Sequence, residues 1–426
     1  MNQAADIGNK ASSEGPGEKA AAAASGAASA QAVIAWLLDR ARHTTGRTTA
    51  LLSQLCERLV ASGVPLDRAS LHVRQLHPMF AARTLLWLSE SGGSVEVDRQ
   101  HGVQNTAMFL RSPVKPIYEG GEAIRRRLID PDCPMDYPVL EDLRAQSYTD
   151  YTIRPLLFSG HRPMAIGFST KHPEGFSEAQ IETLEAVLSP LAAVLELHEQ
   201  QRTARLLMDT YIGRSAGERV LGGAIRRGYG EIIPAAIWYC DLRGFSSLSE
   251  EIELDSLIST LNDYFDHVGA AIEAAGGEIL KFIGDGILAI FPLENTDKTA
   301  GARASGKALE AANRALGELE DLNRKRREEG KPEIRYGISL HIGDVMYGNV
   351  GAKARLDFTV IGPAVNLTCR LENLTRDVEP PLVLSQAFAQ CCGRSVKSLG
   401  RFKLKGIAAE QEAFTLSACK VRDNRG

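Results

Sequence analysis

The sequence has no pair of cysteines with the C-x-x-C spacing of a zinc or redox site, although it contains seven cysteines. An odd, scattered set in a chain of 426 residues argues against a disulfide scaffold and favours a reducing compartment. The sequence also lacks an apolar run long enough to cross a membrane. The Ala-rich stretch from Ala20 to Leu38 has no basic segment directly before an apolar core, so we do not expect a signal peptide. These absences predict a cytoplasmic protein without a membrane span.

A strong excess of one charge is absent as well. The chain has 49 Lys and Arg against 53 Asp and Glu, which gives a net charge of −4. This balance excludes a dominant basic surface for nucleic acid, so we expect no nucleic-acid partner. Hydrophobic residues make up 44% and charged residues 24%, as in globular proteins that bury a sizeable core. The length predicts two or three domains.

Changes in composition divide the chain into segments. The first segment has almost no large apolar side chains, so it cannot offset the entropy of ordering and is expected to be disordered. A Gly- and Arg-rich stretch separates two halves of different texture. The predicted segments are an Ala/Ser/Gly-rich tail at residues 1–30, a domain with a long exit helix at 31–205, a connector at 206–233, a second domain at 234–418 and a tail at 419–426.

In the first half, apolar periodicities predict an antiparallel sheet flanked by helices. A long Pro-containing stretch from about residue 99 to residue 151 is expected to be irregular. The predicted elements are helices at 32–62 and 177–205 and strands at 70–76, 84–88, 152–158 and 164–169.

In the second half, the order of predicted elements is strand, helix, hairpin, long helix and hairpin. This order predicts an α+β fold, with helices on one face of a mostly antiparallel sheet. The elements are a strand at 235–240, a helix at 254–272, a hairpin of strands 278–282 and 287–291, a helix at 299–327, and a second hairpin of strands 335–342 and 345–348 that turns at Gly343-Asp344.

Two carboxylates follow buried-type strands in this half. Asp241 closes a strand before a Gly-containing turn, which can present backbone N–H groups to a phosphate while the carboxylate holds a cation. Asp285 lies at a Gly-Asp-Gly hairpin tip. The alternative is that both residues only stabilise turns. Lys281 lies in an otherwise apolar strand, so it needs a partner or a ligand if it faces inward.

A third segment runs from a strand through Gly362-Pro363 into a helix. Asn366 and Arg370 are four residues apart, so they share one face of that helix. A neutral donor beside a fixed cation suits a ribose and a charge that develops on phosphate, although an ordinary surface pair is the alternative. Together with the two carboxylates, this pair indicates two-metal phosphoryl chemistry.

The combined segments resemble the catalytic domain of class III nucleotide cyclases over residues 237–416. The resemblance lies in D-L-R-G-F-S at 241–246, K-F-I-G-D-G at 281–286, H-I-G-D-V-M-Y-G-N-V-G at 341–351 and F-T-V-I-G-P-A-V-N-L-T-C-R at 358–370. It implies a ferredoxin-like α+β fold and conversion of a nucleoside triphosphate into a cyclic monophosphate and pyrophosphate.

The resemblance also implies a role for each matching residue. Two Mg²⁺ or Mn²⁺ ions would be held in each site, and the remaining residues would contact the nucleotide. The metal residues are Asp241, Leu242 and Asp285, the substrate-binding residues are Gly244, Phe245, Lys281, Thr359 and Lys405, and the catalytic residues are Asn366 for the ribose and Arg370 for the α-phosphate.

The choice of base follows from hydrogen bonding. Adenine offers an acceptor at N1, to which Lys281 can donate, and a 6-amino donor, which the Thr359 hydroxyl can accept. Guanine would present a donor to Lys281 instead. We therefore expect an adenylate cyclase that uses ATP; a guanylate cyclase or a silent nucleotide-binding module is the alternative. Thr359 also resembles the bicarbonate-responsive subgroup of the family.

The family builds each site between two catalytic domains, and this chain carries the full residue set once, so we predict a C2 homodimer. The first domain resembles a GAF-type sensory domain, on the strand at 164–169, the segment Pro173-Glu174-Gly175-Phe176-Ser177 and the helix that follows. It would be either a regulator that binds a small molecule or a dimerisation platform without a ligand. The exit helix at 178–208 and the connector would transmit its signal.

Overall fold

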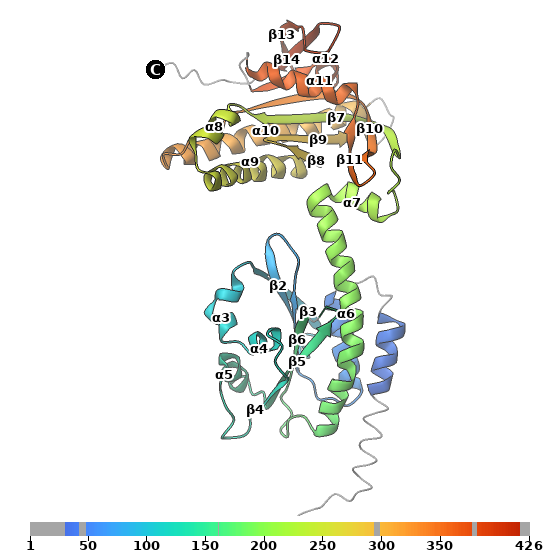
Figure 1. Ribbon diagram of the computed structural model, residues 1–426, viewed down its shortest axis with the longest axis vertical. Coiled ribbons are helices and arrows are strands. Elements are labelled where there is room, and N and C mark those ends of the chain that lie inside the picture. The colour runs from blue at the N-terminus through green and yellow to red at the C-terminus, as the bar shows by residue number, and fades with distance from the viewer. Residues whose placement is uncertain (1–29, 42–47, 161, 294–298, 377–380, 418–426) are drawn as a thin grey trace, which may run out of the picture. The chain divides into compact units, whose positions relative to one another are not determined.

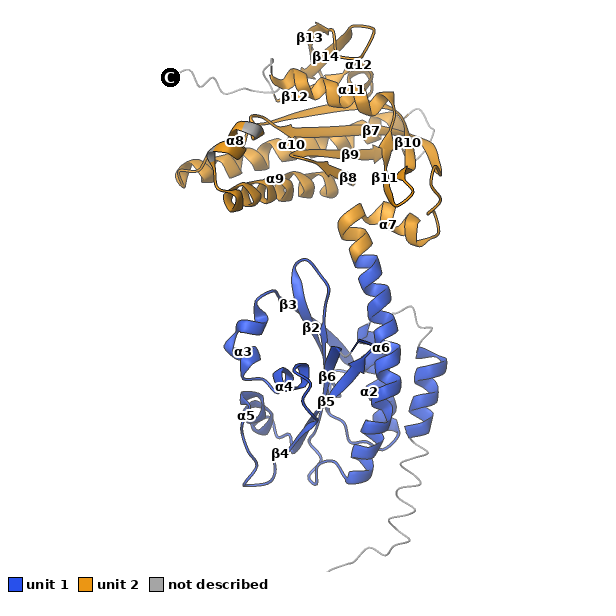
Figure 2. Ribbon diagram, in the orientation of Figure 1, with its two compact units in different colours: residues 1–206 blue, residues 207–426 orange. Residues whose placement is uncertain are grey.

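The computed structural model describes residues 30–41, 48–160, 162–293, 299–376 and 381–417. The chain divides into two compact units, residues 1–206 and residues 207–426 (Figure 2). The predicted tail at 419–426, and all of the tail at 1–30 except Ala30, lie outside the described residues.

The N-terminal unit is built on an antiparallel sheet with the strand order β3-β2-β1-β6-β5-β4. All four predicted strands are confirmed, as β1, β2, β5 and β6. Two further strands, β3 and β4, were not predicted from the sequence. The strands are β1 (Arg68–Arg74), β2 (Phe80–Leu88), β3 (Gly93–Gln100), β4 (Ile124–Arg127), β5 (Asp150–Phe158) and β6 (Arg162–Thr170).

Helices cover the two faces of this sheet differently. A helix at residues 30–39 and the helices α2 (Thr48–Ala61) and α6 (Glu178–Ile212) share one apolar core with the sheet. Three short helices lie on the side of the sheet away from α6 (Figure 1). They belong to the stretch predicted to be irregular, which is therefore partly helical: α3 (Ala107–Leu110), α4 (Val114–Tyr118) and α5 (Pro138–Ala145).

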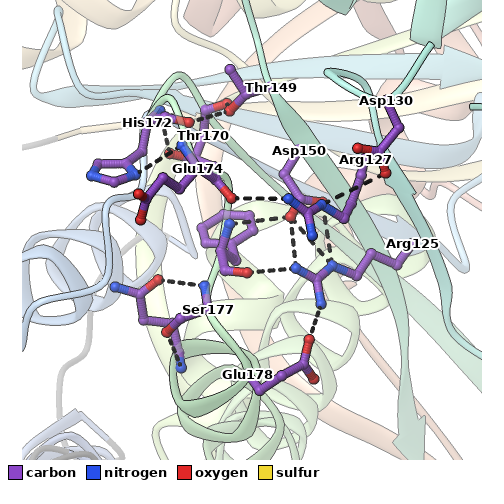
Figure 3. Close-up of polar contacts among 12 residues, drawn as sticks. Arg125, Arg127, Asp130, Thr149, Asp150, Thr170, His172, Glu174, Ser177 and Glu178 are labelled. Carbon is purple, nitrogen blue, oxygen red and sulfur yellow. Dashed lines mark hydrogen bonds and ion pairs between the residues drawn. The ribbon is translucent and has the colours of Figure 1, made fainter. Parts of the chain in front are cut away.

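A buried carboxylate fixes the start of α6 against the sheet. Asp150 on β5 is fully buried, and its Oδ2 lies 2.8 Å from a guanidinium nitrogen of Arg125 on β4. The same guanidinium lies 2.9 Å from Glu178, the first residue of α6, and the backbone N–H of Phe176 donates to Asp150 (Figure 3). Because a buried charge needs a partner and further hydrogen bonds, this network holds β4, β5 and the helix start together.

The C-terminal unit contains a second sheet, with the order β13-β14-β12-β10-β7-β9-β8 and with β11 paired to β10. All its pairs are antiparallel except β10 with β12. This agrees with the predicted, mostly antiparallel sheet. The strands are β7 (Gly230–Leu242), β8 (Glu278–Ile283), β9 (Gly286–Pro292), β10 (Tyr336–Ala352), β11 (Arg355–Ile361), β12 (Leu382–Ser385), β13 (Val396–Phe402) and β14 (Gln411–Leu416).

The helices of this unit pack on both faces of the sheet, so the prediction of one covered face is wrong. Successive residues of a strand point to opposite faces. Trp238 on β7 packs in the core with α9 and α10, whereas its neighbour Ile237 packs with Ala364 and Val365 of α11. The helices are α7 (Arg214–Leu221), α8 (Phe245–Glu251), α9 (Leu254–Ala274), α10 (Ala300–Glu328), α11 (Pro363–Glu372) and α12 (Gln386–Cys391).

The second predicted hairpin does not exist. Gly343 and Asp344 lie inside β10, which pairs continuously with β7 from Tyr336 opposite Leu242 to Gly348 opposite Gly230. A Cβ on Gly343 would lie 3.0 Å from the Cβ of Ala364 on α11. Glycine at this position therefore allows α11 to pack closely on the strand. The chain turns later, between β10 and β11.

The predicted connector at 206–233 is mostly regular structure. Helix α6 continues through its first residues to Ile212, α7 follows after Gly213, and β7 begins at Gly230. Apart from Gly213, only the residues between α7 and β7 are irregular. No helix within the described ranges is long and apolar enough to cross a membrane.

Candidate active site

Asp241 lies at the end of β7, directly opposite Gly337 of β10 in the sheet. Its side chain is half-buried, and its Oδ1 is buried without a hydrogen-bond partner. A buried carboxylate oxygen without a hydrogen-bond partner lowers the stability of the folded state. This oxygen is therefore suited to accept a hydrogen bond from a ligand or to bind a cation.

The hairpin of β8 and β9 brings Asp285 beside Asp241. Cys240 of β7 pairs with Ile287 of β9, which places the turn of the hairpin next to the end of β7. A Cβ on Gly286 would lie 2.7 Å from the Tyr239 hydroxyl and 3.2 Å from Asp241 Oδ1, so glycine keeps this approach open. The sequence prediction that the two carboxylates belong to one site agrees with this geometry.

The electrostatics of the pair favour a bound cation. The pKa of Asp241 is raised to about 7. The main cause is burial, and the charges of Asp285 and Glu372 and a hydrogen bond with Asp285 act in the same direction. Such mutual repulsion of carboxylates is relieved by a divalent ion, and oxygen ligands are the ones that Mg²⁺ and Mn²⁺ prefer. The residues present therefore fit a divalent cation. Within the described ranges, no group of three or more His, Cys, Asp or Glu is arranged to hold a metal ion.

Glu372, the last residue of α11, was missed by the sequence analysis. It is 1% exposed, and it accepts a hydrogen bond of 3.0 Å from Thr375 Oγ1. Burial raises the pKa of Glu372, while Thr375, Arg376 and Arg243 act in the opposite direction. A Cβ on Gly337 would lie 2.6 Å from Glu372 Oε1, so the glycine opposite Asp241 makes room for this carboxyl group. Glu372 thus adds negative charge behind the Asp241 and Asp285 pair.

The turn after Asp241 leads directly into a helix. Leu242 is buried at the end of β7, and Gly244 precedes α8 with a φ of 72°, a left-handed conformation that favours glycine. Phe245 is half-buried and begins α8. The roles predicted for these three residues stay predictions.

Lys281 faces the neighbouring hairpin. Its Nζ lies 2.7 Å from Asp357 Oδ2 on β11, and its side chain is 29% exposed. Thr359 lies two residues further along β11, on the same face as Asp357, and its buried Oγ1 has no hydrogen-bond partner. Asp357 is thus the partner that Lys281 was expected to need. Asp357 was not identified from the sequence, although side chains alternate along a strand and position 357 therefore shares a face with Thr359.

Asn366 and Arg370 both lie on an exposed face of α11, as their spacing predicts. Gly362 precedes the helix with a φ of 146°, and Pro363 is its first residue. Lys405 is exposed in the loop between β13 and β14. Across the described residues, no hydrogen bond or ion pair joins Asn366 or Arg370 to Asp241, Asp285 or Lys281.

Comparison with known sequences finds a family that is similar to the C-terminal unit. Residues 230–418 match the family described as the adenylate and guanylate cyclase catalytic domain. This match supports the predicted class III cyclase domain and its α+β fold.

Two curated relatives are similar to part of the chain. An adenylate cyclase of Anabaena cylindrica is 39% identical over 155 residues, which are 35% of this chain and 29% of the relative. Adenylate cyclase 1 of Rhizobium meliloti is 32% identical over 178 residues, 41% of this chain and 26% of the relative. The chain therefore spans less than a third of the length of either relative. Among solved structures, the adenylyl cyclase CyaB from P. aeruginosa aligns with a TM-score of 0.41 at 24% identity, over 46% of this chain and all of that one.

Proposed function

We propose that this protein is an adenylate cyclase, which converts ATP into 3′,5′-cyclic AMP and pyrophosphate in its C-terminal unit. The observation that carries the proposal is the pair of carboxyl groups of Asp241 and Asp285, with the unpartnered Oδ1 of Asp241, inside the region that matches the cyclase catalytic domain. Two curated relatives that match part of the chain are named adenylate cyclase, which supports the choice of reaction.

Asp241 and Asp285 would hold two Mg²⁺ or Mn²⁺ ions, with Leu242 beside them. When bound, these ions lower the pKa of the ribose 3′-hydroxyl and neutralise charge on the triphosphate. The 3′-oxygen then forms a bond to the α-phosphorus, the bond from that phosphorus to the bridging oxygen of pyrophosphate breaks in line, and the hydroxyl proton passes to water.

The exposed polar residues of α11 and of the last hairpin would position the substrate. Asn366 would orient the ribose, and Arg370, one turn later on the same face, would stabilise charge on the α-phosphate in the transition state. Lys405 would contact the terminal phosphates, and the backbone N–H groups near Gly244 and Phe245 would bind phosphate oxygens.

Base selection would rest on Lys281 and Thr359. Lys281 would donate to adenine N1, and the unpartnered Thr359 Oγ1 would accept from the 6-amino group. Asp357 supports this assignment because its ion pair with Lys281, at 2.7 Å, directs the ammonium group along the strand face that carries Thr359.

Asp357→Asn is expected to raise the KM for ATP about three- to tenfold, with a smaller effect on kcat, because Lys281 loses the group that positions it. The preference for ATP over GTP should fall as well. Asp357 is exposed and Lys281 is partly exposed, so the loss of stability should stay under about 1 kcal/mol. Steady-state kinetics with both nucleotides measure the effect, and Asp357→Glu should restore most of the affinity. An Asp357→Asn variant with wild-type KM and preference would show that the ion pair is incidental.

The active site would form between two copies of this chain, with the metal residues of one copy facing the base, ribose and Arg370 contacts of the other. Within the described residues of one chain, no hydrogen bond or ion pair joins Asn366 or Arg370 to Asp241 or Asp285, which is compatible with this arrangement. A C2 dimer would then contain two equivalent sites.

Co-expression of Asp241→Asn and Arg370→Ala chains with different affinity tags tests the shared site. Each variant alone should be inactive. Protein purified through both tags contains mixed dimers, in which one site carries both defects and the other carries neither, so about half of the wild-type activity is expected. Doubly tagged protein without activity would contradict the shared site, and a failure to recover doubly tagged protein would contradict the dimer.

We propose in addition that the N-terminal unit is a GAF-like domain that regulates the cyclase. Its antiparallel sheet and long exit helix support this interpretation. Helix α6 is unbroken from Glu178 to Ile212, and residue 206 is the last of the N-terminal unit. A rotation of this helix is the simplest way for the first unit to change a site shared between two chains.

A further inference from the structure

Helix α7 packs on two strands of the C-terminal unit, β8 and β11 (Figure 1). Ala216, in its first turn, is fully buried in one apolar core with Leu280 of β8 and Phe358 of β11. A Cβ on Gly213, which precedes the helix, would lie 3.1 Å from the carbonyl oxygen of Ile279 on β8. A helix of eight residues is too short to be stable alone, so these contacts hold α7 in place.

The carboxylate of Glu278 connects β8 to both α7 and β10. Tyr347 of β10 is 2% exposed, and its hydroxyl donates a hydrogen bond of 2.6 Å to Glu278 Oε1. Burial raises the pKa of Glu278. Hydrogen bonds with Tyr347, with the Ser215 side chain and with the Ala216 backbone lower that pKa. Because the first N–H groups of a helix have no partner within it, Glu278 caps α7 from a distant strand.

The ring of Tyr347 is held between α7 and β11. On one side, the guanidinium of Arg219, one turn further along α7, lies 4.9 Å from the ring centre. The same guanidinium pairs with Glu231 of β7. On the other side, the rings of Tyr347 and Phe358 meet edge to face, with their centres 4.8 Å apart. Tyr347 therefore transmits the position of α7 to β11.

The strands in this network also carry the residues assigned to the base. A register shift in β8 makes Glu278 and Lys281 pair with residues two positions apart on β9, so both face the same side of the sheet. On β11, Phe358 lies in the chain between Thr359 and Asp357, the partner of Lys281. The contacts of α7 are thus one to three residues from the groups that would read adenine.

No backbone ladder joins β8 to β11 in the described part of the chain. β8 is the last strand of its sheet, and β11 pairs with β10 alone. The side chains of Lys281 and Asp357 are 29% and 57% exposed, and an ion pair with this exposure is too weak to fix two strands. The buried contacts of Glu278, Tyr347 and α7 are therefore the stronger link between the two strands.

We propose that Glu278 and Tyr347 are positioning residues for the base, and that α7 sets the spacing of β8 and β11 through them. This inference rests on the proposed function, because it concerns the residues assigned to adenine. Asp241 and Asp285 lie outside the network, so loosening α7 should change substrate affinity and base preference more than the chemical step. Helix α6, which leads into α7 at Gly213, would thereby act on substrate affinity.

Tyr347→Phe tests the link by removing the hydroxyl that donates to Glu278. We expect the KM for ATP to rise about fivefold, the preference for ATP over GTP to fall about fivefold, and kcat to change less than twofold. A merely structural role would lower the amount of active enzyme and leave both KM and preference unchanged. Tyr229→Phe is the matched control, because this tyrosine lies in the loop after α7 and is 58% exposed; it should behave as the wild type.

Two further variants show whether the effect passes through the proposed route. Arg219→Gln alters only the exposed side of the network and should change KM and preference in the same direction, about two- to threefold. In an Asp357→Asn background, Tyr347→Phe should add less than its full effect, because both substitutions loosen the same pair of strands. Fully additive effects of Tyr347→Phe and Asp357→Asn would contradict this route.

Hydrogen–deuterium exchange of the nucleotide-free protein gives a readout that needs no activity. In Tyr347→Phe, the amides of residues 357–361 should exchange about tenfold faster, while those of β12 stay unchanged. Unchanged exchange in β11, or faster exchange with wild-type KM and preference, would overturn the inference. The absence of cyclic product from the wild type would contradict the proposed function itself, whereas normal activity with unchanged preference in Tyr347→Phe would contradict only the positioning role.

Discussion

Asp241→Asn is expected to lower the rate of cyclic AMP formation by about a thousandfold or more, because several kcal/mol of charge stabilisation at the reacting phosphate depend on the metal ions that this carboxylate holds. The amide is nearly the same size, so it leaves the packing beside Tyr239 and Gly286 unchanged. Cyclic AMP produced from ATP by purified protein measures the effect. Asp266→Asn, at an exposed position of α9, is the matched control and should retain full activity.

The stability of the same variant separates a metal ligand from a structural residue. Folding raises the pKa of Asp241 to about 7, above the value of about 4 for an unfolded aspartate. Above pH 7 the folded state therefore carries the full cost of an ionised, repelled carboxylate, and below about pH 4 both states are protonated and the cost disappears. Without metal, Asp241→Asn should melt at a higher temperature than the wild type at pH 8, and the difference should shrink towards pH 4.

Added Mn²⁺ should raise the melting temperature of the wild type and have little effect on Asp241→Asn, because a ligand that binds only the folded state stabilises it. An Asp241→Asn protein that melts lower than the wild type at pH 8, or one that retains catalytic activity, would contradict the role given to Asp241.

Lys281→Glu combined with Thr359→Cys is expected to reduce the preference for ATP over GTP by about a hundredfold or more, because the hydrogen-bond pattern of the site is reversed. A carboxylate at position 281 accepts from guanine N1, and a thiol at position 359 donates weakly to guanine O6. Rates of cyclic AMP and cyclic GMP formation, compared for the two nucleotides, give the change in preference.

Asp357 complicates this substitution and provides its control. Lys281→Glu would replace the cation that pairs with Asp357 by a second carboxylate facing it, and the two acids would repel each other. Adding Asp357→Asn should therefore increase the rate with GTP further. A double variant that keeps the wild-type preference for ATP would show that Lys281 and Thr359 do not read the base.

Local patterns in the sequence were sufficient to predict most of the strands and helices that carry the site residues. The apolar run before Asp241 predicts the end of β7, the Gly-Asp-Gly turn predicts the hairpin that carries Asp285, and Gly362-Pro363 predicts the start of α11. In each case the residue that stops or turns the chain lies within a few positions of the functional side chain, so local chemistry is enough.

Contacts between distant segments could not be predicted in the same way. Gly343-Asp344 has the composition of a turn, but pairing with β7 along its whole length keeps β10 extended. Glu372 is polar and lies at a helix end, and only the fold shows that it is buried behind Asp241 beside Thr375. Strand β4 was missed because Ile124–Arg127 has three arginines, one of which is anchored by the distant Asp150.

The most direct test of the proposed function is an incubation of the purified full-length protein with Mn²⁺ and either ATP or GTP, followed by separation of the nucleotides. The proposed function predicts cyclic AMP and pyrophosphate from ATP and little or no cyclic product from GTP. Formation of cyclic GMP in preference to cyclic AMP would contradict the role of Lys281 and Thr359. The absence of any cyclic product, from protein that Mn²⁺ stabilises against heat, would contradict the proposal that this protein is a cyclase.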